Sequence, residues 1–178
     1  MVDRTRIIAF VGLAGCGKTT AAMHLTNNHG YRRLRFAEPL KAMLRALGLG
    51  SEEIDGSLKE TPSPLLCGKT PRWAMQTLGT EWGRQLIGED FWQNLWLDRA
   101  ADCLDLDGRI VADDCRFGTE AATVRRLGGT VVRIVGRGGI AGNHSSELMD
   151  FPVDLTIENS GDMRAFLDQV SELTQTAF

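Results

Sequence analysis

The chain has 178 residues, a length typical of one domain with a buried core. Its 43% hydrophobic and 24% charged residues are those of an ordinary globular protein, and a formal net charge of -3 argues against a partner such as duplex nucleic acid. No apolar run approaches membrane-spanning length, and no secretory signal pattern is found at the N-terminus. Four scattered cysteines lack metal-binding spacing, so we expect reduced thiols in the cytoplasm.

A glycine-rich motif near the N-terminus carries the strongest chemical signal. Residues 12–19 read Gly-Leu-Ala-Gly-Cys-Gly-Lys-Thr and match G-x-x-x-x-G-K-[ST], the phosphate-binding loop. An apolar run at 7–11 precedes the loop and a helical pattern follows it, which is the context that this motif requires. Backbone N–H groups and the helix N-terminus would hold the phosphates of a nucleoside triphosphate. We expect Lys18 to bridge the β- and γ-phosphates and the Thr19 hydroxyl to bind Mg²⁺.

The predicted contacts to the nucleoside triphosphate extend over the whole loop. They are Gly12, Ala14, Gly15, Cys16, Gly17, Lys18, Thr19 and Thr20.

Strand-like and helix-like segments then alternate, which predicts an α/β fold with a mostly parallel sheet. After the first helix, residues 31–36 predict a short strand, and a helix with Pro39 in its first turn follows. Residues 48–71 are rich in Gly, Ser, Pro and Thr and predict a flexible, substrate-facing excursion. Thr70 is the expected cap of the next helix, whose apolar stripe is Trp73, Leu78, Trp82 and Leu86.

The second half of the chain supplies a strand that ends in two acids. Residues 109–114 predict a buried strand, and its end is where a Mg²⁺-organising carboxylate belongs; we expect Asp113 in that role, with Asp114 as the alternative. A helix over 119–127 and a strand over 130–135 follow. The glycine-rich residues 136–143 suit a lid over bound phosphates.

A last strand at 154–157 precedes the closing helix. Either Ser160 or Asp162 is expected to cap that helix.

Arginines are the expected stabilisers of charge on a transferred phosphoryl group. Arg116 lies two residues beyond the acidic strand end, and Arg137 opens the glycine-rich stretch. The alternatives are a surface ion pair for Arg116 and a plain exposed charge for Arg137. The arginine pairs at 32–33 and 125–126 are interpreted as solvated faces.

Several aromatic and imidazole side chains are candidates for ligand contact or for packing. Trp92 could stack on a nucleobase, whereas Trp73 and Trp82 fit core packing. His144 has two alternative interpretations, a contact in the lid or a plain surface histidine.

Taken together, these segments resemble the phage-type deoxynucleoside monophosphate kinases of the P-loop kinase superfamily. The most distinctive block is residues 72–81, Arg-Trp-Ala-Met-Gln-Thr-Leu-Gly-Thr-Glu, followed later by Asp-x-x-Arg at 113–116. Further matching blocks are 38–41 (Glu-Pro-Leu-Lys), 59–61 (Lys-Glu-Thr), 90–92 (Asp-Phe-Trp) and 144–147 (His-Ser-Ser-Glu).

The resemblance implies one P-loop kinase domain with five parallel strands and helices on both faces. It implies a monophosphate-binding region at about 49–90 and a lid at about 136–150, with ATP as donor, Mg²⁺ as cofactor and a deoxynucleoside monophosphate as acceptor. Lys18, Arg116 and Arg137 would be catalytic, while Arg137 and Asn159 would also contact ATP, the latter along the adenine. The implied acceptor-binding residues are Lys41, Lys59, Arg72, Gln76, Gly79, Thr80, Trp92, Asp114, Arg116 and Glu120. A phage-encoded enzyme of this kind would work in the host cytoplasm.

Other functions remain open at this point. The nearest is a kinase for another small acceptor, such as dephospho-coenzyme A or a nucleoside, on the same fold. A nucleotide-dependent switch is a second alternative, although the chain has no Asn-Lys-x-Asp motif and has Arg116 where a switch GTPase shows Asp-x-x-Gly. A polynucleotide 5′-end kinase conflicts with the negative net charge. The accepted bases, the choice of sugar and the presence of a homodimer are not predicted.

Overall fold

The computed structural model describes residues 5–138 and 150–175. The chain forms two compact units: unit 1 comprises the chain up to Phe36 and from Trp96 onward, and unit 2 comprises Ala37–Leu95. Most of the predicted lid and the residue His144 lie outside the described residues. Within residues 5–138 and 150–175, no helix has both the length and the apolar content needed to cross a membrane.

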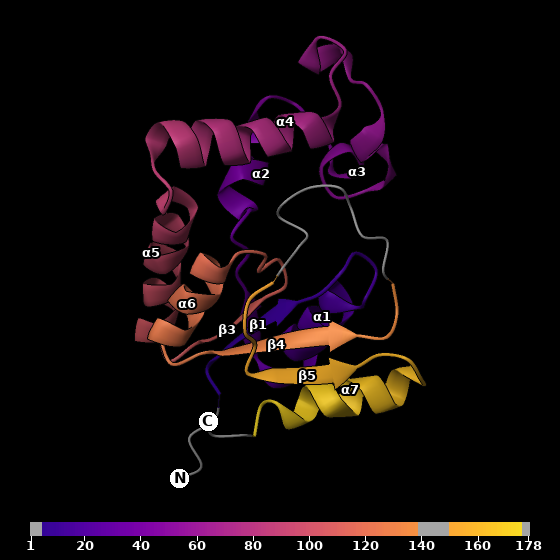
Figure 1. The fold of residues 1–178 in the computed structure, drawn as a ribbon, viewed down its shortest axis with the longest axis vertical. Helices are drawn as coiled ribbons and strands as arrows, with labels where there is room; N and C mark the ends of the chain where they lie inside the picture. The colour runs from indigo at the N-terminus through magenta and orange to yellow at the C-terminus, as the bar shows by residue number, and fades with distance from the viewer. Residues whose placement is uncertain (1–4, 139–149, 176–178) are drawn as a thin grey trace. The chain divides into compact units, whose positions relative to one another are not determined.

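Unit 1 is built on a five-stranded parallel sheet (Figure 1). Its strands are β1 (Ile7–Val11), β2 (Tyr31–Arg33), β3 (Arg109–Ala112), β4 (Thr130–Val135) and β5 (Leu155–Glu158), in the order β2-β3-β1-β4-β5. All five residues of β1 are buried, as expected for a central parallel strand covered on both faces. The predicted α/β fold with five parallel strands is therefore confirmed.

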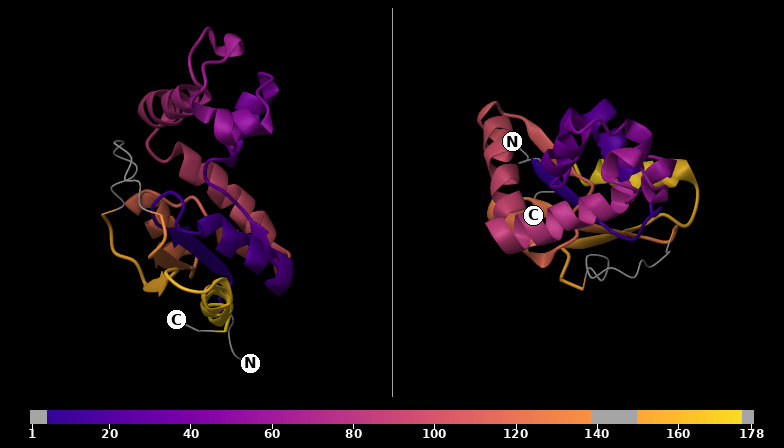
Figure 2. Two further views of the ribbon diagram at one scale, coloured as in Figure 1. Left: turned by 90° about the vertical axis from the view of Figure 1, so that its right-hand side faces the viewer. Right: turned by 90° about the horizontal axis from the view of Figure 1, so that it is seen from above.

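Helices cover both faces of this sheet. They are α1 (Lys18–His29), α5 (Phe91–Asp105), α6 (Gly118–Arg126) and α7 (Met163–Glu172). Ile7 of β1 packs in one core with Trp96 of α5 and Val124 of α6. Phe10, on the other face of β1, packs with α1 and α7, which lie side by side (Figures 1 and 2). Alternate residues of one strand thus serve two separate cores.

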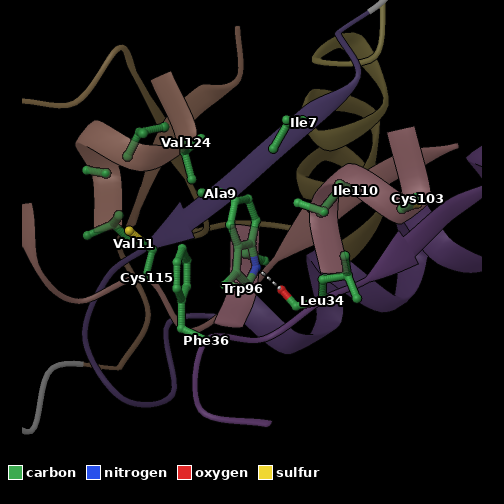
Figure 3. Close-up of a cluster of buried hydrophobic side chains, with 14 residues drawn as sticks. Ile7, Ala9, Val11, Leu34, Phe36, Trp96, Cys103, Ile110, Cys115 and Val124 are labelled. Carbon is green, nitrogen blue, oxygen red and sulfur yellow. Dashed lines mark hydrogen bonds between the residues drawn. The ribbon is translucent and has the colours of Figure 1, made fainter. Parts of the chain in front are cut away.

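Trp96 fixes the chain that leaves β2. Its indole N–H donates to the Leu34 carbonyl at 3.1 Å, and its ring stacks on Phe36 with centroids 4.6 Å apart (Figure 3). The predicted strand over 31–36 is shorter in the structure: β2 ends at Arg33, and the Leu34 N–H still donates to the Val111 carbonyl of β3 at 2.9 Å. The Phe36 N–H then donates to Asp114 Oδ1 at 3.0 Å, so a side chain replaces the strand partner.

Unit 2 is helical. Its elements are α2 (Glu38–Ala46), α3 (Ser51–Ile54), η1 (Ser57–Glu60), η2 (Pro64–Leu66), α4 (Pro71–Thr77), η3 (Leu78–Ile87) and the beginning of α5. Leu40, Leu44, Ile54 and Trp92 form its core. The excursion predicted at 48–71 contains the short helical turns α3, η1 and η2. Its substrate-facing role stays a prediction.

Helix ends agree with most of the predicted caps. The Thr70 hydroxyl accepts the Trp73 N–H at 3.1 Å and begins α4, as predicted. Asp162 caps α7 by accepting the Arg164 N–H, which decides between the two candidates for that helix.

The helix that begins at Pro71 changes its winding. After Thr77 it continues in wide π-helical turns, the segment η3. Trp82 packs into the core of unit 2, but Trp73 is 49% exposed and Leu86 is 77% exposed. The predicted four-residue stripe is wrong at these two positions, because a 3.6-residue period does not continue through wider turns and Trp73 lies under Lys69 at the surface.

Candidate active site

The candidate site of unit 1 gathers residues that follow the carboxyl ends of the strands. The phosphate loop follows β1, Arg33 ends β2, Asp113 follows β3, Arg137 follows β4 and Asn159 follows β5. In a parallel sheet these ends meet at one edge, which is where open α/β folds bind ligands.

Lys18 is folded over the phosphate loop. Its ammonium donates to the carbonyls of Gly12 at 2.5 Å and Leu13 at 2.8 Å. Burial lowers the pKa of Lys18, and the nearby Arg116 guanidinium lowers it further, while Cys16 and Asp113 act in the opposite direction. Lys18 and Arg116 are cations that repel one another electrostatically, and such a pair favours the binding of a polyanion.

Asp113 joins the loop to the sheet edge. Its Oδ2 accepts the Thr19 hydroxyl at 3.0 Å, whereas Asp114 Oδ1 accepts the backbone N–H of Phe36. Asp113 is 5% exposed. A hydroxyl and a carboxylate are the hard oxygen ligands that Mg²⁺ prefers, so this pair fits the predicted metal better than Asp114 does.

Arg33 holds the same carboxylate. Its Nε donates to Asp113 Oδ1 at 2.9 Å, and its Nη2 donates to Oδ2. The interpretation of Arg33 as part of a solvated face is wrong. The reason lies in the strand pairing: Arg33 pairs in register with Val111 on the neighbouring parallel strand, two residues before Asp113. Arg125 is likewise not a plain solvated charge, since it forms an ion pair with Asp154.

Arg116 and Glu120 lie just beyond the acidic strand end. Arg116 is exposed, and its guanidinium forms no hydrogen bond or ion pair with the residues at 5–138 and 150–175. Glu120 is 3% exposed, and its Oε2 accepts the backbone N–H groups of Arg116 at 2.8 Å and Phe117 at 3.2 Å. Glu120 therefore fixes the backbone that presents Arg116. Its predicted contact with the sugar or base stays a prediction.

Glu120→Gln should measure this support. We expect a loss of about 1–2 kcal/mol in the free energy of unfolding, because the cap keeps an acceptor but loses its charge at a helix N-terminus. Urea unfolding of the variant checks this, with the exposed Glu89→Gln as control. An unchanged midpoint, or an equal loss in the control, would contradict the capping role.

Arg137 and Asn159 reach the same end of unit 1. Arg137 is exposed, and its Nη2 donates to the Gly161 carbonyl at 3.2 Å. Asn159 is buried, and its side-chain Nδ2 donates to the Cys16 carbonyl of the phosphate loop at 2.9 Å. Of the two predicted ATP contacts, Asn159 thus lies beside the phosphate loop, and Arg137 lies beside the turn that follows Asn159.

The predicted acceptor-binding cations outside unit 1 lie in unit 2. The Lys41 ammonium pairs with Asp55 at 2.6 Å, and Arg72 pairs with Glu60. Lys59 precedes Glu60 in η1, and η1 and α4 are in contact. The charges of Lys41 and Arg72 are therefore held by carboxylates on neighbouring turns.

The most distinctive block of the resemblance, residues 72–81, spans the change of helix type in unit 2. Gln76 lies in α4, and Gly79 and Thr80 lie in the first turn of η3. The Gly79 carbonyl accepts the Trp92 indole N–H at 2.8 Å, and Trp92 is only 4% exposed. Its ring has no open face for a nucleobase in this conformation. A contact through its edge stays a prediction.

Comparisons with known proteins agree with this description. No family model matches the chain. It is 30% identical, over an alignment of 194 residues, to a protein of Acanthamoeba polyphaga mimivirus described as "Putative deoxynucleotide monophosphate kinase"; the alignment covers 96% of this chain and 97% of that protein. A solved structure from Chloroflexus aurantiacus J-10-fl, described as "a putative kinase", has a TM-score of 0.54 and 17% identity, with 98% of both chains covered.

The fold and the loop define a P-loop kinase. Within that class, the chain belongs to the deoxynucleotide monophosphate kinase family, as the similarity over nearly its whole length shows.

Proposed function

We propose that this kinase transfers the γ-phosphoryl group of ATP to deoxynucleoside 5′-monophosphates, giving the diphosphates, with the assistance of Mg²⁺. The observation that carries the proposal is the hydrogen bond of 3.0 Å between the Thr19 hydroxyl and Asp113, beside the Lys18 ammonium. The name of the mimivirus relative supports the choice of acceptor. Both substrates are free nucleotides in this proposal, and the enzyme works in the cytoplasm.

The donor half of the reaction rests on unit 1. Thr19 and Asp113 would hold Mg²⁺, which would neutralise phosphate charge and orient the β- and γ-phosphates. Backbone N–H groups of the loop bind the phosphates, and Lys18 moves from the loop carbonyls to them. Arg33 keeps the Asp113 carboxylate in one orientation through two donated hydrogen bonds.

The acceptor half needs cations but no strong base. A phosphate monoester is mostly a dianion near pH 7, since its second pKa is about 6. Arg116 has its guanidinium available and is our candidate for stabilising charge on the group in transfer, together with Arg137. Asp114 and Glu120 accompany Arg116 in unit 1.

The remaining acceptor-binding residues are assigned to unit 2, which encloses the proposed monophosphate-binding region at 49–90. These are Lys41, Lys59, Arg72, Gln76, Gly79, Thr80 and Trp92. Charged side chains suit the phosphate, and amide side chains suit the sugar and the base. We also propose that residues 136–150 form a lid over the bound phosphates.

Arg72→Ala should separate the two substrates. We expect the KM for the monophosphate to rise about 10- to 100-fold, because one charge-assisted contact to phosphate is lost, while the Kd for ATP stays unchanged. Steady-state kinetics and ATP titration check this. Arg84→Ala is the matched control, an arginine of η3 in the same unit. Equal weakening of both substrates would remove Arg72 from the acceptor site.

A coupled assay of ADP formation tests the function itself. The acceptors are dAMP, dGMP, dCMP, dTMP and 5-substituted dCMP, their ribose counterparts, dephospho-coenzyme A and nucleosides. We expect ADP release to require a deoxynucleoside monophosphate. Activity restricted to another acceptor would give the chain that function instead, and slow hydrolysis indifferent to every acceptor would indicate a nucleotide-dependent switch.

A further inference from the structure

Asn159 connects the turn after β5 to the phosphate loop. Its backbone N–H donates to the Val135 carbonyl at 2.8 Å, and its side-chain Nδ2 donates to the Cys16 carbonyl at 2.9 Å. Asn159 is 3% exposed, so the second hydrogen bond is buried. A buried hydrogen bond between segments 143 residues apart in sequence fixes the loop to the far edge of the sheet.

The chemistry of the Cys16 carbonyl fixes which end of the amide faces it. A carbonyl oxygen only accepts, so the NH₂ end of Asn159 must point to the loop and Oδ1 must point away. This Oδ1 is buried and has no hydrogen-bond partner among residues 5–138 and 150–175. A buried acceptor without a partner is unfavourable, and an apolar side chain would avoid it. The contribution of Asn159 is therefore the donated hydrogen bond.

Holding the Cys16 carbonyl also aims the next N–H group. In a trans peptide, the carbonyl of residue 16 and the N–H of Gly17 point in opposite directions. With the carbonyl held by Asn159, the Gly17 N–H points away from Asn159. Gly17 directly precedes α1, whose first N–H groups lack helical acceptors and form the anion-binding end of the helix.

The backbone of Gly17 is matched to this arrangement. Its φ is +107°, a conformation that favours glycine, and a Cβ there would lie 2.6 Å from Asn159 Nδ2. The close approach of the amide to the loop therefore depends on a glycine at this position.

We propose that Asn159 is a positioning residue for the phosphate loop: it holds the Cys16–Gly17 peptide so that the Gly17 N–H faces the triphosphate. This role differs from the adenine contact that the family resemblance implies. It rests on the ATP-binding part of the proposed function and is independent of the acceptor.

Asn159→Asp tests the role, because a carboxylate has nearly the same shape but repels the Cys16 carbonyl. We expect the Kd of ATP at pH 8 to rise about tenfold or more, and that of inorganic tripolyphosphate to rise by the same factor. Displacement of a fluorescent ATP analogue, without acceptor, measures both. The KM for the monophosphate should not change.

The pH profile gives a second readout. As the pH falls toward 5, a buried carboxyl group takes up a proton and can donate to the Cys16 carbonyl, so the loss in ATP affinity should shrink relative to wild type. Asn94→Asp, an exposed asparagine in α5, is the matched control and should bind ATP like the wild type at every pH.

Three results would overturn the proposal. One is weakened ATP binding with unchanged tripolyphosphate binding, which would indicate an adenine contact. Another is wild-type affinity for both ligands. The third is a loss of affinity in Asn159→Asp that does not change with pH.

Asn159→Ala provides the same comparison if the aspartate variant does not fold. This variant should raise the Kd of ATP and of tripolyphosphate equally, by about three- to tenfold, and the increase should not depend on pH. Wild-type affinity in this variant would also overturn the role. Because no acceptor is present, a different acceptor specificity would leave the result intact, whereas a wild-type chain that binds neither ligand would contradict the ATP site itself.

Discussion

Lys18→Ala should lower kcat by about 10²- to 10³-fold or more, because it removes the cation that stabilises charge on the transferred phosphoryl group. The KM for the monophosphate should change far less. Single-turnover assays at saturating ATP separate the chemical step from nucleotide binding. Near-normal turnover would contradict the assignment of the loop as the donor site.

The same variant should remain folded. The pKa of Lys18 is lowered mainly by burial, so the folded state disfavours the charged ammonium. For a base whose folded pKa lies below its unfolded value, this destabilisation is fully present below the folded pKa and disappears as the pH rises to the unfolded value. At neutral pH the wild type therefore carries an unfavourable term that alanine removes. We expect a thermal midpoint equal to or above that of the wild type, after allowance for the hydrogen bonds lost to the Gly12 and Leu13 carbonyls and to Cys16 Sγ.

Asp113→Asn should have the second largest effect. We expect kcat to fall about 10²-fold and the Mg²⁺ concentration for half-maximal activity to rise about tenfold, because the amide can still accept the Thr19 hydroxyl but carries no charge for the metal. The gain in ATP affinity on adding Mg²⁺ should also shrink. ATP titrations with and without Mg²⁺ measure that gain without relying on turnover.

Asp114→Asn is the control for this experiment. Its Oδ1 accepts the Phe36 N–H, a contact that an amide oxygen can keep. The Mg²⁺ requirement of this variant should match the wild type. A shift of the requirement in Asp114→Asn but not in Asp113→Asn would exchange the two roles.

The sequence predicted the sheet well because its signals were local. The loop at 12–19 has a fixed spacing, and buried apolar runs such as 7–11 and 130–135 identify strands without knowledge of their neighbours. The capping role of Thr70 also depends on adjacent residues alone and was predicted correctly. For the last helix the sequence left Ser160 and Asp162 open, and the structure has Asp162 as the cap.

The errors arose where a residue's role depends on a distant partner. Arg33 looks solvated until the pairing of β2 with β3 brings it to Asp113. Trp92 looks available for stacking until the Gly79 carbonyl and the core of unit 2 enclose it. The π-helical turns after Thr77 are wider than α-helical turns, so the 3.6-residue period of apolar residues does not describe them. Asn159 was found by resemblance, but its contact with Cys16 required the fold.

The strand order has a consequence for how the chain is made. The central strand β1 pairs with β3 and β4. Ile7 pairs with Ile110 and Ile8 pairs with Thr130, so β1 has neighbours on both sides only after residues about 100 positions later have been made. Unit 2, from Ala37 to Leu95, is a continuous stretch whose contacts are closer in sequence. During synthesis the phosphate loop leaves the ribosome before Asn159, so the loop cannot be completed until Asn159 has followed. The nascent chain should therefore acquire its nucleotide site only after the strand that carries Asn159 has joined the sheet.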